Sequence, residues 1–300
     1  MALLGFLDRG GTREEPSSAT LATALEGFSL EVMPRTAAKV ESFSDLLPGG
    51  TRVYIAHIEG TPIEDMVDTA RRLSAEGMSV MPHFPARIIK DHAQLEDWIL
   101  RYREEAGVEQ ALLLAGGVAK PVGELTSSID LMETGLFDKH GFKRLHVAGH
   151  PEGNKDIDPD GSTRAVDEAL VWKQGFSERT DAEMAIVTQF VFQAQPIIDW
   201  ANRIQAAGVK LPIHVGIAGP AKLQTMIKFA MACGVGPSLK VLQKRAMDLT
   251  KLMLPYEPTE VAEGLAEHMA ANPDSLIKKL HIFPLGGIKA SIEWADRYRN

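Results

Sequence analysis

The sequence predicts a single (β/α)8 TIM barrel, an α/β fold in which eight parallel strands close into a cylinder, with one extra helix before strand eight. Two observations predict it: short apolar runs alternate with longer amphipathic segments, and eight such runs can be counted. The length of 300 residues also suits one large barrel. An open doubly wound sheet is the alternative, but such a sheet has no set count of eight strands.

The predicted strands are the apolar runs that turn residues bound on both sides. They cover residues 28–33, 52–58, 79–84, 110–116, 144–149, 182–190, 211–217 and 278–285. Pro82 interrupts the third run, and a strand tolerates proline mainly near its end or at a bulge. A helix-like stretch follows each run, which is the βαβ pattern.

The predicted helices carry apolar residues at helical spacing. The clearest one has Thr61 and Pro62 at its cap and first turn and ends at Gly77, and another covers 91–106 and ends at Gly107. The other helical stretches centre on 124–136, 163–174, 194–207, 220–232, 237–250, 258–270 and 287–298.

Composition excludes several classes of protein. Hydrophobic residues make up 45% and charged residues 24%, which excludes a disordered or fibrous chain. The net charge of -8 argues against nucleic acid as a partner, and no apolar stretch approaches the roughly 18 residues of a membrane span. The single cysteine, Cys233, cannot form an internal disulfide and lies in a helix-like run, where we expect a buried thiol. A reducing, cytoplasmic location fits best.

The predicted organisation is an N-terminal leader over 1–25 followed by one barrel domain over 26–300. The leader has its charges after a very short apolar run, unlike a secretory signal. Its apolar residues are expected to pack on a partner or across the bottom of the barrel. They are Leu3, Leu4, Phe6 and Leu7.

Polar residues and glycines gather at the carboxyl ends of the predicted strands, where barrels carry their chemistry. They are Glu31, His57, Glu59, His83, Arg87, Ala115, Gly116, Gly117, His150, Glu152, Gln189, Gly216, Gly219, Gly286 and Gly287. No metal is expected there, because His146 and His150 lie four apart on one strand, about 13 Å along its axis. A GxSxG nucleophile elbow is missing, and the strand runs contain no central lysine for a Schiff base.

Two glycine-rich turns, 216–220 and 284–290, follow strands seven and eight. Barrels often hold a phosphate there on backbone N–H groups, but plain strand-to-helix turns explain the same glycines. Glu31 is more informative. Alternation along 28–33 places it on the opposite face from Leu30 and Val32, so it either points into a polar active site or forms a buried ion pair. We favour the active site.

Five segments together resemble one known family, the methylenetetrahydrofolate reductases. SLEVMPRT resembles that family's S-F-E-F-F-P-P-[RK] opening, SVMPHF its A-P-H-L strand, LLLAGG its L-A-L-R-G-D strand, HVAGHPEG its V-A-A-Y-P-E and IVTQFVF its A-I-T-Q-F-F-F. These segments occupy residues 29–36, 79–84, 112–117, 146–153 and 186–192. The family consists of FAD-dependent (β/α)8 barrels of one-carbon metabolism, and the resemblance covers about 28–290.

The resemblance implies roles for individual residues. Glu31 matches the general acid, which protonates N10 of methylenetetrahydrofolate so that its five-membered ring opens. Gln189 matches the glutamine that binds the folate and nicotinamide head groups. The residues that fall where the family binds FAD are His57, His83, Ala115, Gly116, Gly117, Ala148, His150 and Lys173. The resemblance further implies tetrahydrofolate derivatives as partners and a homo-oligomer. Lys173 would pair with the pyrophosphate, unless it is a solvated helix charge.

The sequence departs from the family pattern at two positions. Both are expected to affect the contacts to folate and pyridine nucleotide more than the contacts to flavin. Gly117 replaces an aspartate, and Gly287 replaces an arginine, with Lys289 two residues on. The sequence therefore leaves open whether NADH, NADPH or neither donates electrons. Two other functions stay open: a flavin barrel acting on another reduced pterin or a phosphate-bearing substrate, and a non-catalytic folate- or flavin-binding relative.

Overall fold

The computed structural model describes residues 18–232 and 255–299, and its strands close into one barrel. All neighbouring pairs are parallel, and β1 pairs with both β2 and β8. The fold prediction is thus confirmed. The strands are β1 (Ser29–Val32), β2 (Arg52–Ile55), β3 (Ser79–Pro85), β4 (Gln110–Leu114), β5 (Arg144–Gly149), β6 (Glu183–Val191), β7 (Ile213–Ala218) and β8 (Ile277–Phe283).

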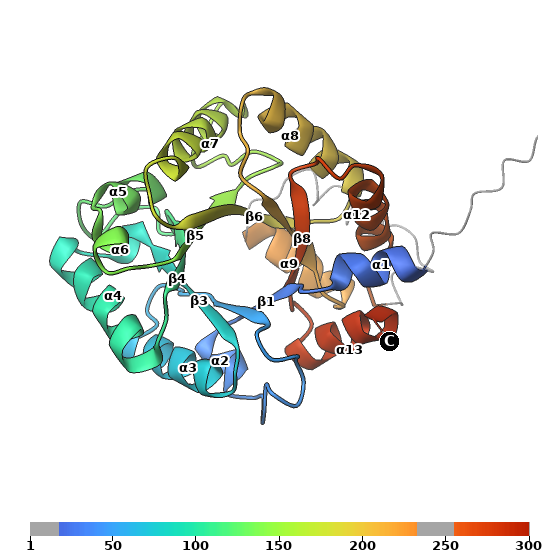
Figure 1. The fold of residues 1–300 in the computed structure, drawn as a ribbon, viewed down its shortest axis with the longest axis horizontal. Coiled ribbons are helices and arrows are strands. Elements are labelled where there is room, and N and C mark those ends of the chain that lie inside the picture. The colour runs from blue at the N-terminus through green and yellow to red at the C-terminus, as the bar shows by residue number, and fades with distance from the viewer. Residues whose placement is uncertain (1–17, 233–254, 300) are drawn as a thin grey trace, which may run out of the picture.

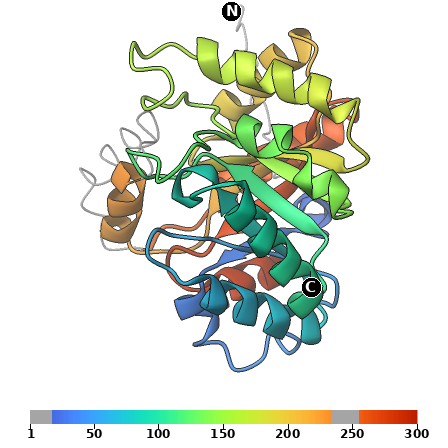
Figure 2. The ribbon, with the colours of Figure 1, turned by 90° about the vertical axis from the view of Figure 1, so that its left-hand side faces the viewer.

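Helices surround the barrel as a ring, which Figure 1 shows along the barrel axis. They are α1 (Ser18–Leu25), α2 (Pro34–Ala37), α3 (Ile63–Ala75), α4 (His92–Ala106), α5 (Ser128–Glu133), α6 (Leu136–Lys139), α7 (Arg164–Ser177), α8 (Ala194–Ala206), α9 (Leu223–Ala232), α12 (Thr259–Ala271) and α13 (Ile288–Arg299). Helix α9 stands away from the ring (Figure 2), and its apolar side packs on Phe190, Phe192 and Ala218 at the carboxyl ends of β6 and β7.

The last part of the predicted leader is a packed helix. In α1, Leu21 and Leu25 are buried, and the helix contacts α12 and α13. Figure 1 shows these three helices side by side. The four apolar residues near the start of the chain, at positions 3, 4, 6 and 7, lie outside the described residues.

Most helix predictions agree with the structure, and one is wrong. The stretch around 124–136 is two short helices, α5 and α6, because Gly135 adopts a left-handed φ of 66° between them. The extra helix before strand eight is present, since both α9 and α12 precede β8. The predicted helix over 237–250 and Cys233 lie outside the described residues.

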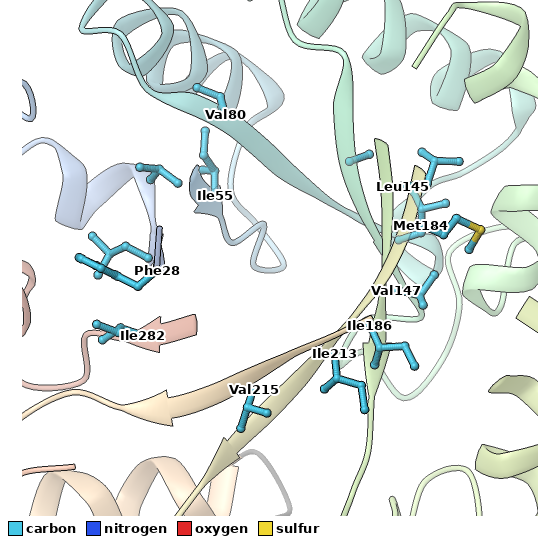
Figure 3. Close-up of a cluster of buried hydrophobic side chains, with 14 of the residues drawn as sticks. Phe28, Ile55, Val80, Leu145, Val147, Met184, Ile186, Ile213, Val215 and Ile282 are labelled. Carbon is cyan, nitrogen blue, oxygen red and sulfur yellow. The ribbon is translucent and has the colours of Figure 1, made fainter. Parts of the chain in front are cut away.

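The main apolar core lies between the barrel and its helices. Leu30 and Val32 of β1 belong to it, as the alternation in this strand predicts. Figure 3 shows further strand residues of the same layer, among them Ile55, Val80, Val147, Ile186, Val215 and Ile282. Since every second strand residue points outward into this layer, the alternate residues are left to fill the barrel interior.

Pro82 lies in the middle of β3, where the strand changes partners. The β2–β3 pairing ends at Ile55 and Pro82, and the β3–β4 pairing begins at His83 and Leu112. Proline has no backbone N–H to donate, and Pro82 lies where the pairing with β2 ends and the pairing with β4 begins. None of the helices in the described parts of the chain combines the length and the apolarity that a membrane span requires.

Candidate functional site

A cavity of about 1190 Å³ opens at the carboxyl ends of the strands. We call it the carboxyl-end cavity. The structure brings five of the predicted site residues to its wall: Glu31, His57, His83, Ala148 and Gln189. Its volume exceeds the roughly 300–1,000 Å³ of an ordinary small-molecule pocket, so two flat ring systems can fit together.

The wall of this cavity is mostly apolar. It includes side chains from the strand ends and from α9: Leu112, Leu114, Val187, Phe190, Phe229, Phe283 and Leu285. Three cations, Arg35, Lys39 and Lys289, stand at its rim, and the Nζ of Lys289 lies 3.8 Å from Glu293. An apolar wall with a few charged groups suits a flat, partly anionic ligand.

Glu31 is the carboxylate that projects from the barrel floor into this cavity. Its side chain is 20% exposed, and its Oε2 lies 3.3 Å from His83 Nε2 and 3.9 Å from His281 Nε2. Among the described residues, neither ring nitrogen has a hydrogen-bond partner. Glu31 is thus flanked by two imidazoles, of which His83 is the nearer and is placed to exchange a proton with it, and one carboxylate oxygen is left to face a ligand.

The barrel interior beneath Glu31 is unusually polar, and sequence analysis missed it. Ser29 is hydrogen-bonded to His281 Nδ1 at 2.9 Å, and the Tyr54 hydroxyl to His146 Nδ1 at 2.6 Å. The Tyr54 ring lies 4.6 Å from His281, and the His146 ring 4.9 Å from His214. We call these five residues the polar column. Barrel interiors are ordinarily filled with branched apolar side chains, so this column is a departure from the fold's usual packing.

Burial keeps the column uncharged. It lowers the pKa of His146 and His281 well below the ordinary value, and it lowers the pKa of His214 to about 3, helped by the charges of Arg52 and Lys279. Near neutral pH, these rings are therefore hydrogen-bonding groups with one N–H and one lone pair each. The neutral His281 ring therefore adds no positive charge beside Glu31.

A bulge in β6 turns Gln189 toward the cavity. The β6–β7 register shifts between Val187 and Phe190, and the Thr188 hydroxyl accepts a hydrogen bond from Gly216 N–H at 2.9 Å. Because of the shift, Thr188, Gln189 and Phe190 all line the cavity. Bulges often re-aim a side chain at a functional site in this way.

His57 is a hydrogen-bond acceptor on the cavity wall. Its Nε2 lies 3.0 Å from the Thr61 carbonyl oxygen, so that nitrogen donates, and burial lowers the pKa of the ring. Nδ1 is then a buried lone pair, and it has no partner among the described residues. The ring also packs on Trp98, with centroids 4.9 Å apart.

His150 and Lys173 lie beside the carboxyl-end cavity rather than in it. His150 lines a small adjoining pocket that shares Gln189 and Phe190 with the cavity. Lys173 of α7 is only 6% exposed, and burial lowers its pKa to about 8. Burial also lowers the pKa of His150 to about 4, and the positive charge of Lys173 adds to this effect. Lys173 is therefore a buried cation rather than a solvated helix charge.

Ala115, Gly116 and Gly117 follow β4 and do not appear in the wall of the carboxyl-end cavity. Ala115 O accepts a hydrogen bond from Arg87 N at 2.9 Å, and the Arg87 guanidinium donates to two carbonyls of the following loop. These hydrogen bonds of Arg87 thus hold the loop after β4 in place. Gly116 needs its left-handed φ of 93°, whereas Gly117 is exposed with open space around its α-carbon.

The two glycine-rich turns pack against each other. A Cβ on Gly286 would lie 2.0 Å from Pro220 O, and one on Gly219 would lie 2.2 Å from Ser291 Oγ. These glycines permit close approach of backbone, which favours plain turns over a phosphate loop. Gly286 and Gly287 both line the carboxyl-end cavity, but Gly287 differs because it has open space where a side chain would stand.

Comparison with solved structures finds a protein of similar fold. No family model matches this chain. A solved structure of an uncharacterized protein from Clostridium thermocellum, described as binding two copies of 5-methyl-5,6,7,8-tetrahydrofolic acid, superposes with a TM-score of 0.56. It is 12% identical to this chain, and the match covers 92% of this chain and 96% of that one. Within the described residues, no group of three or more His, Cys, Asp or Glu side chains is arranged to hold a metal ion.

Proposed function

We propose that the carboxyl-end cavity binds a reduced folate beside FAD and that the protein interconverts 5,10-methylenetetrahydrofolate and 5-methyltetrahydrofolate. The observation that carries this proposal is the position of Glu31. It is a partly buried carboxylate at the floor of a large apolar cavity, between two imidazoles. The fold-level likeness to a folate-binding protein and the sequence resemblance to the reductases support the same assignment.

Glu31 supplies the proton in this proposal. When it protonates N10, the bond between N10 and the bridging carbon breaks and the N5 iminium remains. A hydride then adds to that carbon to give the methyl group, so the reduction consumes one proton at N10 and one hydride, which is two electrons and a second proton in total. In the reverse direction, Glu31 accepts the proton as the ring closes. His83, 3.3 Å away, is placed to exchange the proton with Glu31 between turnovers.

Gln189 and the cationic rim orient the folate. An amide can donate to and accept from the pterin edge, and the bulge in β6 places Gln189 in the cavity wall. Arg35 and Lys39 stand where carboxylates of a folate's glutamate tail would reach solvent. A rim charge of this kind raises the rate of association and fixes the direction in which the ligand enters.

The residues present fit FAD. The unpartnered Nδ1 of His57 and Nε2 of His83 offer hydrogen bonds in the cavity, and Ala148 leaves space for a ring. Lys173 is a buried cation that an anion such as the pyrophosphate would neutralise, with His150 beside it. When bound, FAD supplies or accepts the hydride. A cytoplasmic location, a homo-oligomer and the choice of NADH or NADPH stay predictions.

The first experiment is to identify and count the ligands. The purified full-length protein is denatured and the released flavin is identified by chromatography, after which 5-methyltetrahydrofolate is titrated into the flavin-loaded protein. We expect the released flavin to be FAD and the native protein to bind 5-methyltetrahydrofolate. Gln189→Ala should bind the folate more weakly than Gln195→Ala, a matched control on α8 outside the cavity wall. FMN in place of FAD would favour a phosphate-bearing substrate. Binding without reduction of the flavin would favour a non-catalytic relative.

A further inference from the structure

A second cavity, of about 330 Å³, opens at the amino end of the barrel, opposite the carboxyl-end cavity. We call it the amino-end cavity. Its wall is built from the entry to β1, the loop before β2, and single residues of β2, β7, β8 and α13: Gly27, Phe28, Ser29, Pro48, Gly49, Gly50, Thr51, Arg52, His214, Lys279 and Arg299. The volume is at the lower end of the range for small-molecule pockets.

The charge of this wall is one-sided. Among the described residues of the wall there are three permanent cations, Arg52, Lys279 and Arg299, and no acidic residue. Arg52 donates to the neutral Gln110 amide at 3.2 Å, and Lys279 donates to the Glu26 carbonyl at 3.0 Å. Within the described residues, Arg299 alone of the three has a carboxylate partner, Asp296, at 3.1 Å. Among the described residues, Arg52 and Lys279 thus have no carboxylate within ion-pairing distance, and Glu183 acts on Arg52 only from farther away.

His214 is the second observation, and it is independent of the first. It lines the cavity but is only 8% exposed, and its buried Nδ1 has no hydrogen-bond partner among the described residues. Buried polar atoms are nearly always paired. This nitrogen is itself closed to the cavity, so an anion beside the cations would complete its hydrogen bonding once the ring turns.

The sheet itself places these groups together. The β7–β8 register shifts between Ile213 and His214, so that His214 pairs with Lys279 and Lys278 is passed over. Lys279 therefore lines the amino-end cavity, whereas Lys278 is exposed and donates to the Pro273 carbonyl at 2.7 Å. Two consecutive lysines in one strand thus have different surroundings, which provides a matched control.

We propose that the amino-end cavity is a second ligand site, which takes a small organic phosphate. Arg52, Lys279 and Arg299 bind its phosphate oxygens, and His214 donates the remaining hydrogen bond after its ring turns toward the cavity. A phosphate monoester fits this set better than a single carboxylate, because it carries nearly two charges and three acceptor oxygens. Inorganic phosphate would leave most of a 330 Å³ cavity unfilled. The site stands apart from the folate assignment and does not depend on it.

The test is calorimetric titration of the full-length protein with glycerol 3-phosphate at constant ionic strength, with glycerol, inorganic phosphate and citrate as parallel titrants. We expect one glycerol 3-phosphate per chain and tighter binding than inorganic phosphate. Lys279→Met should weaken binding by about 10-fold or more, because a charge-assisted hydrogen bond is lost, and Lys278→Met should leave it unchanged.

Three results would overturn the proposal. The first is no saturable binding of glycerol 3-phosphate, and the second is an equal loss of affinity in both lysine variants. The third is binding of citrate alone, which would mean that the site takes polycarboxylates and not phosphates. If Lys279→Met does not fold, Arg299→Met at the end of α13 replaces it with the same expected loss. The His214 ring resonances provide a further readout in the unmodified protein, since they should shift on saturation with the phosphate.

Discussion

The two ends of the barrel share one interior but differ in where their charged groups lie. At the carboxyl end, Glu31 projects into a wide apolar cavity, and cations stand only at the rim. At the amino end, the described residues that line a smaller cavity include three cations and no acid. The polar column joins them, from His281 beside Glu31 to His214 in the wall of the amino-end cavity.

Under the two proposals, this difference separates two kinds of task within one barrel. An acid that gives a proton to a ligand must be close to it and shielded from water, which an apolar cavity provides. A cationic cavity holds an anion by permanent charge and has no proton to give. The predictions below test how far each end depends on its own residues, in order of decreasing expected effect.

The largest effect should follow removal of the carboxyl end's acid. Glu31→Gln keeps the size of the side chain but cannot donate a proton, so folate turnover should fall by about 10²–10⁴-fold while FAD and folate still bind. Glu59→Gln, an exposed acid just after β2, is the matched control and should retain activity. Steady-state turnover and ligand titration distinguish the two. Normal turnover in Glu31→Gln would remove this residue from the mechanism.

The next effect concerns the buried cation of the carboxyl end. Lys173→Met should weaken FAD binding by about 10–100-fold, because a charge-assisted contact to phosphate contributes about 1.5–3 kcal/mol. Lys228→Met, an exposed lysine on α9 beside the cavity, should bind FAD normally. Fluorescence titration of the apoprotein measures both. Equal affinities would mean that Lys173 has no part in holding the cofactor.

Lys173 also predicts a pH effect with a defined sign. Burial lowers its pKa to about 8, below the unfolded value of 10.5, so between these values the unfolded chain binds more protons. The contribution of this group to stability is therefore present at high pH and is lost as pH falls through about 8. FAD binding near pH 9 should take up a proton, which calorimetry in two buffers of different ionisation enthalpy detects, and Lys173→Met should abolish the uptake.

A smaller effect should follow from removing the hydrogen bond between Tyr54 and His146 in the polar column. Tyr54→Phe leaves the buried His146 Nδ1 without its 2.6 Å partner and should lower the free energy of unfolding by about 1–3 kcal/mol. Tyr102→Phe is the control, since the Tyr102 hydroxyl is buried without a partner among the described residues. Its removal should be neutral or stabilising, as denaturant unfolding will show. Equal losses would mean that the column contributes only packing.

The smallest effect should come from adding an acid to the carboxyl end. Gly117 is exposed, has a φ open to other residues and has free space around it, so Gly117→Asp should fold normally. A unit charge near the flavin disfavours its reduction, and solvent exposure limits the effect to about 1 kcal/mol, or roughly 20 mV for a two-electron couple. The flavin potential of Gly117→Asp should fall below that of Gly117→Asn. Identical potentials would contradict the proposed place of this turn beside the flavin.

The strands and most helices could be predicted from the sequence, because alternation and caps are local patterns. The outward placement of Leu30 and Val32 follows from such a pattern in β1. The split at Gly135 could not be predicted, because a helix tolerates single glycines and only the left-handed φ shows the break.

The site was predictable only in part. Glu31 and Gln189 lie at strand ends and could be found by position and resemblance. The polar column depends on the registers of five strands, and the amino-end cavity depends on a bulge that selects Lys279 over Lys278. Neither has a sequence motif. Burial of Lys173 likewise needs the packing of α7, which periodicity alone does not reveal.

The most direct test of the folate assignment is a single anaerobic mixing experiment. Oxidised, FAD-loaded protein is mixed with 5-methyltetrahydrofolate in a stopped-flow instrument, and the flavin absorbance is followed at about 450 nm, where oxidised flavin absorbs. We predict a loss of absorbance in the native protein that is slowed by about 10²–10⁴-fold in Glu31→Gln. A flavin that stays oxidised at saturating 5-methyltetrahydrofolate, or one that is reduced equally fast in both proteins, would contradict the account.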